Sequence, residues 1–88
     1  MIKLVAITPH GPAELALTFS DGSHGLWSAA SLIAQITVLT EPLADPVYFA
    51  RAFIEAGALA WPNGLELAPW SLQAELRETG TLVSAREG

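Results

Sequence analysis

Hydrophobic and polar positions alternate most clearly over residues 13–19, where Leu15, Leu17 and Phe19 are separated by small or polar residues. A period of two is typical of a β-strand that buries one face. The preceding run over residues 2–8 is β-branched and apolar on both faces, and it also predicts a strand. The chain therefore begins with two consecutive strands.

Turn residues place two hairpins in the sequence. The Ser-Asp-Gly-Ser segment at 20–23 can adopt the positive φ of a tight turn, so residues 24–27 are predicted to return as a third strand. Residues 53–55 and 58–61 form a second apolar pair around Gly57 and predict a second hairpin. The Pro-Asn-Gly segment that follows is interpreted as the end of this strand region.

The first helix is predicted over residues 29–36, because Leu32, Ile33 and Ile36 fall on one face at helical spacing. Ser28 precedes this segment and is the expected N-cap. Thr-Val-Leu at 37–39 is compatible with either a frayed helix end or an extended link.

Two further helices have clear boundary signals. An acid followed by proline, Asp45 and Pro46, is a strong helix start, and this short helix is expected to end near Ala52. The last helix is predicted from residue 69 or 70 to 79, with Gly80 as its C-terminal stop. Its leucines at 72 and 76 are spaced to face inward.

This order of elements predicts an α+β fold. We expect a small, mainly antiparallel sheet of about five strands in two hairpin units, with two or three short helices packed on one side. Residues 1–80 are expected to form a single domain and residues 81–88 a C-terminal tail. Within that tail, Leu82 and Val83 could add an edge strand to a partner.

The hydrophobic content and the lack of cysteine exclude several classes of site. The chain has 88 residues, 51% of them hydrophobic, and no cysteine, so disulfides, thiolate metal sites and thiol nucleophiles are excluded. A small apolar core without disulfides favours self-association, and a homodimer is expected. No apolar run reaches the length of a membrane span and no signal peptide is recognised, so the expected location is the cytoplasm.

No motif for catalysis or metal binding is recognised. His10 and His24 stand alone, without the spacing of metal ligands. Asp21, His24 and Ser28 lie too close together in sequence to converge easily as a catalytic triad, and no nucleophile-elbow motif accompanies them. The protein is therefore expected to have no enzymatic activity, no cofactor and no metal.

The charge is unevenly distributed. The chain has 4 Lys and Arg against 9 Asp and Glu, a net charge of −5, and residues 41–78 hold six of the acids but only two arginines. Direct binding of nucleic acid is not expected, because four scattered basic residues cannot neutralise a phosphate backbone. The acidic segment is compatible with a merely solvated surface or with a surface that attracts a basic protein.

The chain has three tryptophans, and their side chains provide much of the apolar surface that so short a chain can bury. Trp27 and Trp61 are expected in the core, and Trp70, beside Pro69 at a helix start, is the candidate interface anchor. Four residues are taken as candidates for an interface or pocket: Trp61, Asn63, Glu66 and Trp70.

Three segments carry a resemblance to a known family: Phe-Ser-Asp-Gly at 19–22, Leu-Ala-Asp-Pro-Val-Tyr-Phe at 43–49, and Leu-Ala-Trp-Pro-Asn-Gly-Leu-Glu-Leu-Ala-Pro at 59–69. In this order they resemble the bacterial domain of unknown function 2442. The resemblance covers residues 1 to about 72, and Trp-Pro-Asn-Gly is its most distinctive motif. The family's shared residues look architectural, and it provides no catalytic residue to transfer.

The resemblance implies a small α+β module. Such modules are sometimes fused to a helix-turn-helix domain and often encoded beside another small protein, in arrangements that resemble toxin–antitoxin pairs. This chain has Ser28 where relatives commonly place an acid, and it carries no helix-turn-helix extension. We therefore expect an interaction or regulatory module, the acidic, antitoxin-like partner of a small basic protein.

Two other classes remain open. The first is a regulatory domain that binds a small molecule in a pocket lined by Phe49, Trp61 and Trp70. The second is an unrecognised hydrolase, which would require a concave site with converging polar groups.

Overall fold

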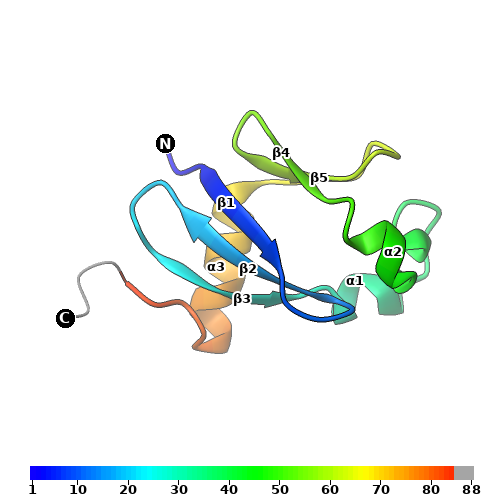
Figure 1. Cartoon of the computed structure of the whole chain (residues 1–88). Helices are drawn as coiled ribbons and strands as arrows, with labels where there is room; N and C mark the ends of the chain where they lie inside the picture. Colours follow the sequence, from blue (N-terminus) through cyan, green and yellow to red (C-terminus); the bar gives the residue numbers. More distant parts are fainter. Residues whose placement is uncertain (85–88) are drawn as a thin grey trace.

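The first three strands form an antiparallel sheet in sequence order in the computed structural model, which describes residues 1–84 (Figure 1). They are β1 (Leu4–Pro9), β2 (Glu14–Phe19) and β3 (His24–Ser28). On β2 the three alternating large residues are all buried, as the pattern predicts. One face of this sheet therefore lines the core, and the other is left to solvent.

The second sheet differs from the prediction. It contains β4 (Phe53–Glu55), β5 (Ala58–Ala60) and β6 (Glu66–Leu67), in the order β4-β5-β6. The expected single sheet of about five strands is wrong: the described residues contain six strands in two three-stranded sheets.

The extra strand arises because the Pro-Asn-Gly segment reverses the chain instead of ending the strand region. Trp61 N–H donates to Leu65 O at 3.0 Å, and Gly64 N–H donates to Trp61 O at 3.1 Å, so β6 returns alongside β5. Leu4 N–H donates to Gly57 O at 2.8 Å and joins the two sheets at one point. No ladder continues from that bond, so the sheets remain separate.

The helices occupy two places in the molecule. Helix α3 (Pro69–Thr79) passes behind the β1-β2-β3 sheet, whereas α1 (Ala30–Gln35), the 3₁₀ helix η1 (Glu41–Ala44) and α2 (Pro46–Phe49) gather beyond the end of β3 (Figure 1). The described residues thus hold three α-helices, but only α3 lies across a sheet.

Helix boundaries agree with the sequence signals except at two ends. The Asp45 carboxylate accepts a hydrogen bond from Val47 N–H at 2.9 Å, and Gly80 ends α3 with φ 77°. Helix α2 ends at Phe49, three residues earlier than expected. Ser28 is not the N-cap of α1, because the cap position is Ala29; Ser28 Oγ accepts from Ala30 N–H at 3.2 Å.

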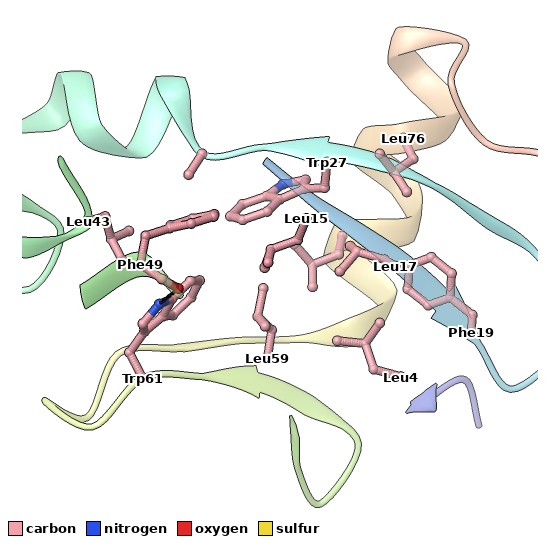
Figure 2. Close-up of a cluster of buried hydrophobic side chains, with 12 residues drawn as sticks. Leu4, Leu15, Leu17, Phe19, Trp27, Leu43, Phe49, Leu59, Trp61 and Leu76 are labelled. Atoms are coloured by element: carbon pink, nitrogen blue, oxygen red, sulfur yellow. Dashed lines mark hydrogen bonds between the residues drawn. The ribbon is translucent and has the colours of Figure 1, made fainter. Parts of the chain in front are cut away.

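Aromatic rings form the centre of the core (Figure 2). Trp61 packs against Trp27 with ring centroids 6.4 Å apart and against Phe49 at 5.8 Å. Trp61 Nε1–H donates to Phe49 O at 3.1 Å, the dashed line in Figure 2. Trp27 and Trp61 are thus core residues, as expected from the sequence.

The beginning of the expected tail pairs with the sheet. Val83 N–H donates to His24 O at 2.7 Å, and His24 N–H donates to Val83 O at 3.0 Å. Leu82 is partly buried against the core. Val83, which the sequence suggested for an edge strand on a partner, therefore pairs with the β3 edge of its own chain. The rest of that tail, residues 85–88, lies outside the described residues.

Candidate interaction surface

Asn63 connects three segments of the chain. Its backbone N–H donates to the Tyr48 hydroxyl at 3.0 Å, and its side-chain Nδ2 donates to Leu39 O at 3.1 Å. Its Oδ1 accepts from Leu65 N–H at 3.1 Å, which closes the turn between β5 and β6. Asn63 is exposed, but its polar groups hold the loop after α1, helix α2 and the β5–β6 turn together.

The other three candidate site residues are not gathered around Asn63. Trp61 is 1% exposed and lies in the core, whereas Trp70 is 66% exposed at the start of α3. Glu66 is an exposed residue of β6. Phe49 is as buried as Trp61, and their rings pack against each other. Trp70 is thus separated in exposure from the buried Phe49 and Trp61, and none of the three lines the cavity described below.

The loop after α1 is held by two threonines, which resolves the ambiguity over residues 37–39. Thr37 N–H donates to Thr40 Oγ1 at 3.0 Å, and Thr40 N–H donates to Thr37 Oγ1 at 3.1 Å. The two hydroxyl oxygens are 2.8 Å apart. Since Thr40 is buried, these bonds fix the loop and leave Val38 at its tip.

Four large apolar side chains are exposed within twelve consecutive positions of this end of the molecule. The exposed fractions are 72% for Ile36, 90% for Val38, 42% for Leu39 and 75% for Val47. We call these four residues the 36–47 surface. Scattered exposed aliphatic residues are ordinary, but such a group at one end of a small domain is typical of an interaction site.

Carboxylates accompany these apolar residues. Glu41 begins η1 and Asp45 caps α2, and both are exposed. No Lys or Arg occurs in the sequence between Lys3 and Arg51. The guanidinium of Arg51 lies 5.9 Å from the centroid of the Tyr48 ring. The 36–47 surface is therefore apolar with acidic neighbours.

A separate cavity of about 450 Å³ lies on the outer face of the first sheet. Small residues on β2 and β3 leave room for it, and Val83 with Thr81 forms one wall. It is lined by Ala16, Leu17, Thr18, His24, Gly25, Leu26, Thr81 and Val83. Sequence reasoning missed this cavity, although the small residues between the buried leucines of β2 were a signal for an open outer face.

Asp21 links the β2–β3 turn to α3. Its Oδ1 accepts from Ser23 N–H at 2.9 Å and from the Ser23 hydroxyl at 2.6 Å, and its Oδ2 accepts from Gln73 Nε2 at 3.1 Å. The Ser23 hydroxyl, followed by the Ser23 N–H and with a smaller contribution from Gln73, lowers the pKa of Asp21 below its ordinary 3.8. The cluster is a structural turn that stabilises the ionised carboxylate.

Changing Asp21 to Asn is expected to reduce the pH dependence of stability in acid. A carboxyl whose folded-state pKa lies below its unfolded value stabilises the fold above the unfolded pKa, and that contribution is lost as the pH falls through the folded pKa. Melting temperatures measured from about pH 5 to about pH 2 should fall less steeply for Asp21→Asn than for the unaltered protein. Glu78→Gln, the same chemical change on α3, is the control. Identical profiles for the unaltered protein and Asp21→Asn would contradict the assignment.

Residues 1–84 contain neither a cluster of metal-ligating side chains nor a helix that could cross a membrane. Nowhere in this range are three His, Asp or Glu side chains grouped so that they could hold a metal ion. Among its helices, none combines the length and apolar character needed to span a bilayer.

Comparisons with known proteins gave no relative. A scan against protein-family models found no match, and searches of curated proteins and of solved structures found no similar protein.

Proposed function

We propose that this protein is a non-enzymatic interaction module of the bacterial cytoplasm that binds a small basic protein, in the manner of an acidic antitoxin-like partner. The observation that carries this proposal is the set of hydrogen bonds made by Asn63, the polar residue of the Trp-Pro-Asn-Gly motif. Its hydrogen bonds go to Leu39, Tyr48 and Leu65, so the motif organises the backbone around a surface. The motif resemblance to domain of unknown function 2442 leads to the same class of function.

Charge supports a basic partner. The segment 41–78 has six acids and two arginines, and the exposed acids of this segment lie on several elements. A field of one sign attracts an oppositely charged protein and disfavours nucleic acid. Asp21, which a hydrolase could have used, is engaged in a turn at the opposite end of β3 from the Asn63 region.

The partner is tested by co-expression with the product of the adjacent gene. Size-exclusion chromatography at about 0.05 M and about 0.5 M NaCl should give one complex at low salt that dissociates at high salt, because exposed charges are screened. Separate elution at both salt concentrations would contradict the proposal, and so would a complex that salt does not affect.

A small-molecule regulatory domain is the second candidate, and the cavity of about 450 Å³ favours it. Its volume is within the range of ligand pockets, and its lining is mainly apolar with His24 and two threonines as polar groups. Under this alternative, an apolar fluorescent dye should bind the unaltered protein, and Ala16→Leu should weaken that binding by occupying part of the cavity.

Self-association is also part of the proposal. The outer face of the β1-β2-β3 sheet presents Ala6, Thr8, Ala16 and Leu26, whereas the 36–47 surface has carboxylates beside it. On this face β2 carries a single carboxylate, Glu14, at the start of the strand, so two chains of net charge −5 can meet around Ala16 and Leu26 with little repulsion. Sedimentation equilibrium should therefore show a dimer that Leu26→Lys dissociates.

A further inference from the structure

We infer that the basic partner docks on the 36–47 surface, and that it presents an amphipathic helix with apolar side chains on one face and Lys or Arg beside them. This inference rests on the proposed function and specifies its contact site. An exposed apolar group with charges at its edge fits a helix that carries both kinds of side chain.

The loop that carries Val38 is preorganised. The reciprocal Thr37 and Thr40 hydrogen bonds close it, and Glu41 N–H donates to Thr37 O at 2.9 Å. Asn63 Nδ2 adds a bond to Leu39 O from a distant part of the chain. A loop that is already ordered loses little conformational entropy when a partner covers it, so its apolar side chains can contribute fully to binding.

Asn63 also fixes this loop relative to α2. It bonds to Leu39 O through its side chain and to the Tyr48 hydroxyl through its backbone N–H. Val38 and Val47 are the sequence neighbours of these two bonded residues. The two most exposed side chains of the 36–47 surface therefore belong to segments that are both hydrogen-bonded to one residue, Asn63.

Isoleucine at position 36 is unfavourable for the stability of the isolated chain. It is the C-cap of α1, with φ 49° and ψ 59°, in the left-handed region that disfavours β-branched residues. Glycine is the common residue at such a helix end. Because Ile36 is also exposed, it gains little from burial in the chain itself. Strain retained at an exposed apolar position is typical of a site whose function lies in binding.

Charge decides between a basic partner and a second copy. Glu41 and Asp45 lie in the same stretch as the apolar residues, and both are exposed. A second copy meeting this surface would place carboxylates against carboxylates, which is unfavourable. Lys or Arg side chains on a partner helix would instead be attracted to both acids.

The direct test is a titration of the ¹⁵N-labelled protein with a synthetic Leu/Lys amphipathic peptide of about 14 residues, followed by NMR. The largest shift changes are expected at residues 36–47, and a Leu/Glu peptide of the same pattern should cause none. Val38→Ser and Val47→Ser should each weaken binding about fivefold to tenfold, because each removes apolar area from the contact. Val5→Ser makes the same change at another exposed valine, 57% exposed on β1, and as the control should leave the affinity unchanged.

Ile36→Gly separates the binding role from a folding role. Glycine relieves the left-handed strain, so the melting temperature should rise by a few degrees. Peptide affinity should nevertheless fall about threefold or more, since the isoleucine side chain is lost. A variant that is more stable and binds as well as the unaltered protein would contradict the inference.

Neutralising Glu41 and Asp45 tests whether their negative charges attract the basic peptide. Glu41→Gln combined with Asp45→Asn keeps a competent N-cap on α2, because asparagine caps as well as aspartate. This double variant should bind the Leu/Lys peptide more weakly and with less dependence on salt. Glu75→Gln with Glu78→Gln on α3 removes the same charge elsewhere and should have a smaller effect on both.

The outcomes distinguish the inference from the proposed function. Peptide shifts centred on the outer face of β2 and β3, shifts spread evenly over the surface, or no binding would overturn the inference. A salt-sensitive complex with the adjacent gene product that survives Val38→Ser and Val47→Ser would also overturn it, while the proposed function would stand. Failure of that complex to form would remove the proposed function itself.

Discussion

Trp61→Ala is expected to lower the free energy of unfolding by about 3–5 kcal/mol, which is a large share of the stability of a domain this small. The indole is fully buried between Trp27 and Phe49, so truncation leaves a large cavity at the centre of the core. It also removes the hydrogen bond from Nε1–H to Phe49 O. Urea denaturation followed by far-ultraviolet circular dichroism measures the loss without depending on tryptophan fluorescence.

The control for this prediction is the same substitution at an exposed tryptophan. Trp70→Ala removes an equal side chain from the start of α3, where it is largely exposed, so the change should stay within about 0.5 kcal/mol. Similar losses of unfolding free energy for the two variants would mean that the buried aromatic cluster does not stabilise the core more than an exposed tryptophan does.

Gly25→Ala is expected to cost about 2–3 kcal/mol and to release the C-terminal segment from β3. A Cβ at position 25 would lie 2.6 Å from Thr81 O and 3.2 Å from Leu76 Cδ1. The first of these is a backbone atom, so the segment at Thr81 must move away, and the bonds between His24 and Val83 would be strained or lost. Hydrogen exchange at the amides of His24 and Val83 should therefore accelerate more than exchange in β4 and β5.

Gly64→Ala provides the contrast, because a Cβ at that position meets no atom within 4 Å. Its φ of 95° makes alanine unfavourable by about 1 kcal/mol for a purely local reason. Exchange at His24 and Val83 should stay unchanged. If hydrogen exchange at these two amides accelerated equally in both variants, the effect of Gly25→Ala would not come from its close contact with Thr81.

Local patterns were sufficient for most of the elements. The alternation of Leu15, Leu17 and Phe19 specifies a strand and its buried face, because side chains on a strand alternate between faces. Asp45 before Pro46 specifies a helix start, and Gly80 specifies a helix end, because both depend on the conformations of a few neighbouring residues.

The second sheet is where local reasoning failed. Proline, asparagine and glycine favour a turn, but the same residues can end a strand region or reverse it into another strand. The outcome depends on whether the chain after Gly64 finds a partner, and β6 finds one in β5. A two-residue strand has too little pattern of its own to be recognised before that pairing is known.

The sequence by itself determined the two hairpins, the start of α2, both ends of α3, the central tryptophans and the excess of acid, since each is a property of neighbouring residues or of composition. Only the tertiary structure decided what Asn63 does, because its bond to Leu39 spans 24 positions and its bond to Tyr48 spans 15. It also decided that Val83 pairs with His24 and that four apolar side chains remain uncovered between Ile36 and Val47. Exposure is set by what the rest of the chain covers, and that depends on contacts between residues far apart in sequence.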